Sequence, residues 1–151
     1  MLDREAIRVA LARHPARTVE PGELRPAAVL VPLFVKGGED HLLFTRRTDQ
    51  VNHHRGEISF PGGSWDRGDA DLQATALRET EEEMGICPDD VQVLGRLHDS
   101  ISVHGYHVVP YVGAFEYPYP FRVNAAEIDE VIEVPLETLR DPAIFLTEDW
   151  S

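Results

Sequence analysis

Three glutamates at helical spacing have the clearest chemical potential in this sequence. Asp69 or Asp71 can cap a helix that we expect from about residue 71 to 84, because its interior lacks glycine and proline and Gly85 supplies a C-terminal stop. Three carboxylates at i, i+3 and i+4 share one face of this helix: Glu79, Glu82 and Glu83. Each pair repels by about a few tenths of a kcal/mol, and a divalent cation among them would remove that penalty.

The oxygen ligands favour a hard metal ion. Carboxylates that need no cysteine or histidine partner suit Mg²⁺ or Mn²⁺, which keep water ligands and commonly share them with substrate phosphates. On the spacing alone, however, an ordinary solvated acidic face explains the same residues. The glycines before the helix and the arginine within it are needed to decide between the two interpretations.

The stretch 60–86 (FPGGSWDRGDADLQATALRETEEEMGI) resembles the Nudix box. That motif runs glycine, five residues, glutamate, seven residues, Arg-Glu, an aliphatic residue, any residue, Glu-Glu, any residue, glycine and an aliphatic residue. The positions that follow this pattern are Gly63, Arg78, Glu79, Glu82, Glu83, Gly85 and Ile86. There are three departures: Asp69 replaces the first glutamate, eight residues separate it from Arg78, and Thr80 is not aliphatic.

The resemblance implies a metal-dependent hydrolase. Its glutamates would hold Mg²⁺ or Mn²⁺ or the attacking water, helped by a backbone carbonyl at Gly62 or Gly63, and Arg78 would orient them through a salt bridge. The paired glycines then have a purpose, because a backbone oxygen approaches a metal closely only where no side chain intervenes. A glutamate in a late loop also approaches the metal in many members, which implies Glu127, or less probably Glu130, as base or extra ligand; a solvated loop acid is the alternative.

A narrower resemblance covers residues 43–63 (LFTRRTDQVNHHRGEISFPGG). It is similar to the signature of the coenzyme A diphosphatase branch, with two departures, Thr48 and Asn52, the latter where a second arginine is usual. The matching positions are Leu43, Thr45, Arg47, Gly56 and Phe60 to Gly63. Coenzyme A carries a 3′-phosphate besides its diphosphate, so its site needs cations beyond the metal. The candidate substrate-binding residues are Arg46, Arg47, Arg55, Phe60 and Gly63.

The implied reaction is hydrolysis of coenzyme A, or of a derivative, to 4′-phosphopantetheine and adenosine 3′,5′-bisphosphate. Asn52 leaves room for another substrate of the same class, such as ADP-ribose, a dinucleotide, NADH or a nucleoside triphosphate. A non-catalytic nucleotide-binding module is the alternative from a different class. Three mutually repelling glutamates count against it.

Composition limits the partners and the compartment. The 151 residues carry a net charge of −13, which argues against nucleic acid and anionic membranes because no basic surplus exists to neutralise phosphates. A single cysteine, Cys87, fits a reducing, cytoplasmic location. We expect no signal peptide and no transmembrane segment. The oligomeric state is not predicted by any pattern.

The remaining elements are expected to build an α/β sandwich with a mixed β-sheet, an architecture implied by the Nudix resemblance. An amphipathic helix is predicted at 3–14, and a further short helix at 135–140. Strands are predicted at 27–35, 41–46, 91–102 and 106–115, with a polar loop at 47–57 at the mouth of the site. Residues 117–120 should form a loop that could offer tyrosine rings to an adenine.

The chain is expected to be one domain spanning residues 1–151. The C-terminal strand and helix usual in the branch are not apparent after residue 140. Three histidines lie near the predicted 91–115 hairpin: His98, His104 and His107. They could line the cleft, but surface or satisfied core positions are the expectation. His53 and His54 lack an i, i+4 partner and are not expected to bind metal.

Overall fold

A computed structural model describes residues 3–18, 22–48, 57–102 and 104–140. The predicted Arg55, together with Asn52, His53, His54 and everything after residue 140, lies outside these described residues.

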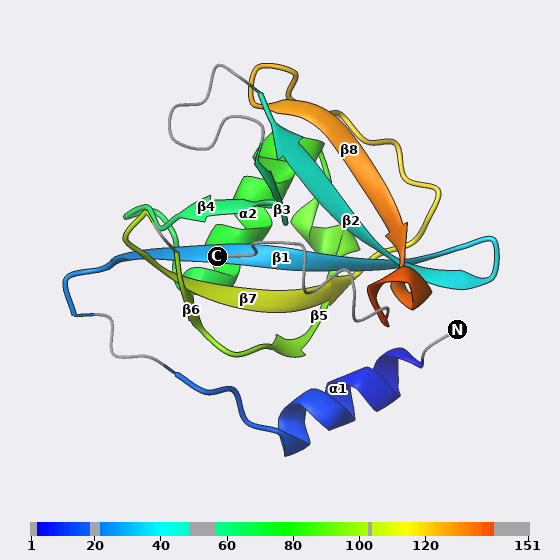
Figure 1. Cartoon of the computed structure of the whole chain (residues 1–151), viewed down its shortest axis with the longest axis horizontal. Helices are drawn as coiled ribbons and strands as arrows, with labels where there is room; N and C mark the ends of the chain where they lie inside the picture. Colours follow the sequence, from blue (N-terminus) through cyan, green and yellow to red (C-terminus); the bar gives the residue numbers. More distant parts are fainter. Residues whose placement is uncertain (1–2, 19–21, 49–56, 103, 141–151) are drawn as a thin grey trace.

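A twisted mixed sheet forms the framework (Figure 1). Its central strands follow the order β3-β2-β1-β7-β5, with β4 on β1, β6 on β7 and β8 on β2. The strand bounds are β1 Arg25–Lys36, β2 Glu39–Arg47, β3 Ile58–Ser59, β4 Gly62–Ser64, β5 Gln92–Arg96, β6 Ser100–Ile101, β7 Tyr106–Ala114 and β8 Ile128–Pro135. Strands β1 and β7 run parallel and the other pairs antiparallel, which confirms the predicted mixed sheet.

Helices cover both faces of the sheet. Helix α2 (Leu72–Met84) packs against one face, where Ala76 meets Ala28 and Leu30 of β1 in a buried cluster. Helix α1 (Arg4–Arg13) lies along β5, and its Ile7 and Leu11 pack against the cluster on the other face. Because side chains alternate along a strand, β1 contributes to both layers.

The predicted box helix is confirmed at both ends. Asp71 is the N-cap, and its carboxylate accepts a hydrogen bond from the Ala74 N–H at 2.8 Å. Gly85 ends the helix in the left-handed conformation with φ 74°, which glycine adopts without a steric penalty. The last carbonyls are also used, since Glu83 O accepts from the Asn124 N–H and Met84 O from the Arg122 N–H. These two bonds attach the loop before β8 to the helix.

Two parts of the chain differ from the prediction. The expected strand at 91–102 is divided into β5 and β6, because the Leu97 N–H donates to Pro110 O while the Asp99 N–H turns to Arg17 O. Strand β8 was not predicted, and its Val131 and Val134 pack against the two core clusters. The short helix η2 (Leu136–Arg140) occupies the predicted position and is of the 3-10 type.

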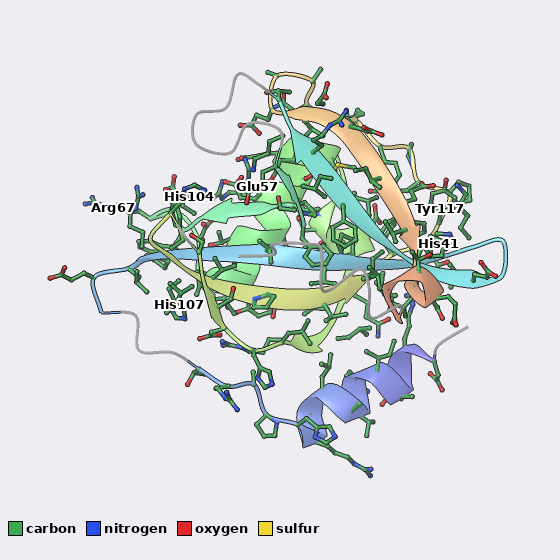
Figure 2. All side chains as sticks on the ribbon, in the orientation of Figure 1. His41, Glu57, Arg67, His104, His107 and Tyr117 are labelled. Carbon is green, nitrogen blue, oxygen red and sulfur yellow. The ribbon has the colours of Figure 1, made fainter. Side chains whose placement is uncertain are left out.

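The tyrosines proposed as an adenine platform pack within the protein. Tyr117 stacks on Phe34 with ring centroids 4.9 Å apart, and the Tyr119 hydroxyl donates to Asp90 at 2.6 Å. Figure 2 shows Tyr117 beside His41, at the end of the β1–β2 hairpin. Within the described residues, no helix is long and apolar enough to cross a membrane.

Candidate active site

A cavity of about 660 Å³ opens on the α1 face of the sheet. Its apolar wall comes from alternate residues of β1 and β7 and from two aromatic rings: Ala27, Val29, Val31, Val108, Phe44 and Phe60. Its charged lining comes from one arginine and four glutamates: Arg47, Glu57, Glu79, Glu83 and Glu127. One wall is therefore apolar while the opposite part concentrates acidic groups.

Glu83 is the most deeply buried of these acids. Only 2% of the residue is exposed, and one carboxylate oxygen accepts a hydrogen bond from the Gly62 N–H at 3.0 Å. Burial raises the pKa of Glu83 to about 8, against the opposing effect of the Arg47 charge. The negative charges of Glu79 and Glu127 add to the rise. A buried carboxylate among like charges is suited to accept a proton or a cation.

Glu79 lies against strand β4, which contains Gly62 and Gly63. A Cβ atom on Gly63 would come within 2.6 Å of the Glu79 carboxyl carbon, so this close approach requires glycine. Burial also raises the pKa of Glu79, and the neighbouring Arg78 opposes that rise. The predicted pair Glu79 and Gly63 is thus brought together in one wall of the cavity.

Arg78 connects the helix to the loop before it. Its guanidinium donates to both carboxylate oxygens of Asp69, at 2.8 and 3.1 Å, and to Glu79 at 2.9 Å. It also donates to Glu82 at 3.1 Å, and the Glu82 side chain is 53% exposed outside the cavity lining. The predicted orienting role of Arg78 thus has a matching geometry. Glu82 faces Arg78 and not the cavity.

Asp69 has a structural role that the sequence did not reveal. Its carboxylate accepts hydrogen bonds from Arg78, the Thr75 hydroxyl and the Asp66 N–H. The Arg78 hydrogen bonds hold the pKa of this buried carboxyl well below its usual value of 3.8. The departure from the motif therefore leaves an anchor for Arg78.

We expect Asp69→Asn to destabilise the protein by about 1–3 kcal/mol at pH 7, because charge-assisted bonds to Arg78 are lost. A carboxyl with a lowered native pKa stabilises the fold fully above its unfolded pKa and loses this contribution as the pH falls through the native value. The deficit should therefore narrow below about pH 4. Denaturant unfolding of the wild type and the variant between pH 3 and 7 measures this difference in the free energy of unfolding. A difference that does not change with pH would contradict the role assigned to the Asp69 charge.

Glu127 reaches the cavity from the loop before β8, and Arg47 from the end of β2. The Glu127 carbonyl accepts from the Thr48 N–H at 3.0 Å, which joins the loop before β8 to the end of β2. Glu127 and Arg47 both line the cavity near Glu83. Within the described part of the chain, Arg47 forms no ion pair, although its charge acts on Glu83. Its charge is therefore available to an anion.

Of the other predicted substrate-binding residues, one lines the cavity and one does not. Phe60 lines the cavity and stacks on Phe44 with centroids 4.5 Å apart. Arg46 pairs instead with Asp129 at 3.0 Å and Glu130 at 2.7 Å on the β8 side. Arg46 is thus not brought into the cavity lining.

Glu57, at the end of the segment predicted to lie at the mouth of the site, lines the cavity but was not named as a candidate from the sequence. Figure 2 labels this residue. It follows the segment 49–56 and directly precedes β3, and its carbonyl accepts from the Arg47 N–H. Its position just before the Phe-Pro-Gly-Gly run was the available signal.

The donor set fits a divalent cation. Over the described ranges, no three or more His, Cys, Asp or Glu side chains are grouped closely enough to hold a metal by themselves, and Glu82 is turned towards Arg78. Glu79 and Glu83 nevertheless face one cavity, beside a glycine pair without Cβ atoms. Hard oxygen donors of this kind suit Mg²⁺ or Mn²⁺, which need few protein ligands.

Comparison with known proteins identifies the family of this chain. A profile of the NUDIX domain matches residues 23–144. The chain belongs to the NUDIX domain family. Members generally require divalent metal ions, and the site described above lies within the matched region.

Curated relatives place this NUDIX domain near two kinds of protein. It is 42% identical over 123 residues to the uncharacterized Nudix hydrolase NudL of Shigella flexneri, covering 82% of the chain and 64% of the relative. It is 40% identical over 118 residues to the peroxisomal coenzyme A diphosphatase NUDT7 of Mus musculus, covering 78% of the chain and 50% of the relative. The chain thus spans between half and two thirds of the length of these relatives.

Solved structures confirm the fold. An Ap4A hydrolase of C. elegans in a binary complex superposes with a TM-score of 0.64 at 21% identity, covering 80% of this chain and 97% of that one. A MutT protein from Methanosarcina mazei gives a TM-score of 0.59 at 19% identity, covering 90% and 86%. The NUDIX domain of Shewanella oneidensis NrtR, solved with ADP ribose, gives a TM-score of 0.58 at 20% identity, covering 81% of each chain.

Proposed function

We propose that this NUDIX domain hydrolyses the diphosphate of coenzyme A or a derivative. The observation that carries the proposal is the single cavity in which Glu79 and Glu83 face Arg47 beside an apolar wall. The 40% identity to a mouse protein named as a coenzyme A diphosphatase supports this substrate. The products would be 4′-phosphopantetheine and adenosine 3′,5′-bisphosphate.

Each residue of the site has its own role in the proposed reaction. Glu79 and Glu83, with the backbone at Gly63, would hold Mg²⁺ or Mn²⁺, which when bound offsets charge on the diphosphate and lowers the pKa of a bound water. Glu82 joins them in the proposal through the motif. Arg78 holds Glu79 in place, and Arg47 binds phosphate oxygens by charge-assisted hydrogen bonds.

Water adds to phosphorus as the bridging P–O bond breaks, and a carboxylate accepts the water's proton. Of the carboxylates proposed for this role, Glu79, Glu83 and Glu127 line the cavity. Phe60 with Phe44 supplies an apolar surface for the uncharged part of the substrate. Arg55 remains a proposed phosphate ligand, and a single domain in a reducing, cytoplasmic compartment remains our proposal for the whole chain.

A second candidate substrate follows from Arg46. Because its charge is paired with Asp129 and Glu130, the cavity has fewer cations than the sequence predicted for coenzyme A. ADP-ribose and other diphosphates that lack a 3′-phosphate need fewer cations in the site. A catalytically idle module is the remaining alternative, and it would bind nucleotide without metal-dependent turnover.

Phosphorus-detected hydrolysis distinguishes these functions. We expect the purified protein to cleave coenzyme A with Mg²⁺ or Mn²⁺, to release adenosine 3′,5′-bisphosphate, and to stop when a chelator is added. Activity on ADP-ribose without activity on coenzyme A would select the second substrate. Binding without turnover of any diphosphate would contradict the enzymatic proposal.

A further inference from the structure

The first residue of β1, Arg25, is an exposed cation beside the cavity, next to a ring that lines it. Arg25 pairs in register with Tyr106 of the parallel strand β7, and its guanidinium carbon lies 4.4 Å from the centre of the Tyr106 ring. The Tyr106 ring lines the cavity. This end of the sheet also carries the β6–β7 turn with His104, while Tyr117 lies at the opposite end (Figure 2).

Within the described ranges, the charge of Arg25 has no acidic partner. Among the described residues, no carboxylate forms an ion pair with Arg25, in contrast to Arg46 and Arg78, which are both paired. The Tyr106 ring contacts the guanidinium in a cation–π interaction, and among the described residues the Arg25 side chain donates no hydrogen bond. A fixed guanidinium with free donors is the group that recognises phosphate in two-pronged fashion.

A hydroxyl donor lies at the same end. Ser102 lines the cavity, and its Oγ accepts hydrogen bonds from the N–H groups of His104 and Tyr106, both at 3.2 Å. Because these bonds use the oxygen's lone pairs, the hydroxyl hydrogen is left to donate.

The separation from the glutamate site fits a nucleoside. Ala28 pairs with Gly63, and Arg25 precedes Ala28 by three residues on the same strand. Three residues of strand span roughly 10 Å. A ribose bridges such an interval when its 5′ side carries the diphosphate and another position carries a phosphate.

We propose that Arg25, held by Tyr106 and assisted by Ser102, is a second anion site that binds a phosphate monoester on the nucleoside half of the substrate. This inference rests on the proposed function, where that group is the 3′-phosphate of coenzyme A. Arg25 would supply the positive charge that Arg46 does not provide, because Arg46 is paired with Asp129 and Glu130. The site therefore determines whether substrates with a third phosphate are preferred.

Direct binding tests the site without catalysis. Each nucleotide is titrated into the protein in the presence of Mg²⁺ in a calorimeter. The wild type should bind adenosine 3′,5′-bisphosphate about 10- to 100-fold more tightly than adenosine 5′-monophosphate. Arg25→Gln should lose that preference and bind the monophosphate as before. Arg13→Gln, at an exposed arginine on α1, is the matched control and should keep it.

The ring is tested separately. Tyr106→Phe keeps the surface beneath the guanidinium and should keep the preference, whereas Tyr106→Leu should reduce it. An equal affinity of the wild type for the two nucleotides would overturn the inference. So would a preference that survives Arg25→Gln, or a loss that affects both nucleotides equally.

Turnover separates this inference from the proposed function. Coenzyme A should be cleaved with a lower KM than 3′-dephospho-coenzyme A, and Arg25→Gln should raise only the former KM. If neither compound is cleaved, the proposed function fails, while the titration still decides the anion site. If both are cleaved and Arg25→Gln changes neither KM, the anion site fails and the function stands.

Discussion

Replacing Glu83 by glutamine is expected to lower kcat by about 10²- to 10⁴-fold without unfolding the protein. Glutamine keeps the shape and can still accept the Gly62 hydrogen bond, but it has no charge for a cation and no basic oxygen for a proton. Steady-state hydrolysis of coenzyme A with Mg²⁺ measures the loss. Glu81→Gln, an exposed change on the same helix, should be nearly silent.

The stability of the Glu83 variant gives an independent readout. The native pKa of Glu83 is raised by burial to about 8, above its ordinary value of 4.5. Between these values the unfolded chain has released the proton while the native protein keeps it, so wild-type stability falls as the pH rises. In chelator at pH 8, Glu83→Gln should therefore unfold at a higher temperature than the wild type, by on the order of a few kcal/mol in free energy.

Glu82→Gln completes this comparison. We expect its turnover to fall by orders of magnitude as well, while its stability gains nothing because the side chain is half exposed. Normal turnover in both the Glu82 and the Glu83 variants would contradict the site. A Glu83 variant that is less stable than the wild type at every pH would instead show that the carboxylate is held by contacts in the fold.

The sequence predicted the box helix because its signals are local. A capping aspartate, an interior without glycine or proline, and Gly85 all act within one turn of the helix ends, and the observed bounds agree. The spacing also placed Glu79 and Glu83 together. The i,i+4 spacing also allows the contact of Arg78 with Glu82, but it could not show that Glu82 would lie outside the cavity lining, because that outcome depends on which side of the helix packs on the sheet.

Contacts between distant segments were beyond sequence reasoning. Arg46 was assigned to substrate, but strand β8 pairs with β2 and brings Asp129 and Glu130 beside it. Likewise, Arg25 meets Tyr106 only because β1 and β7 are parallel neighbours. Non-local strand pairing fixes these partners, and no local spacing encodes it.

A single methyl group on Gly63 is expected to lower kcat by about 10²-fold. The Cβ of Gly63→Ala would lie 2.6 Å from Glu79 Cδ and 2.7 Å from Glu79 Oε2, so the carboxylate must move. No positive φ is required at Gly63, so the backbone itself accepts alanine. The effect should therefore appear in turnover more than in the unfolding temperature.

Two neighbouring glycines make the test specific. Gly68→Ala introduces a Cβ into open space on the same loop and should leave both turnover and unfolding unchanged. Gly62→Ala would place its Cβ 2.3 Å from the Ala28 backbone oxygen, so it should destabilise the pairing of β4 with β1. Full activity in a folded Gly63→Ala protein would show that the position of the Glu79 carboxylate does not control the reaction. Gly63 would then matter only for the backbone of β4.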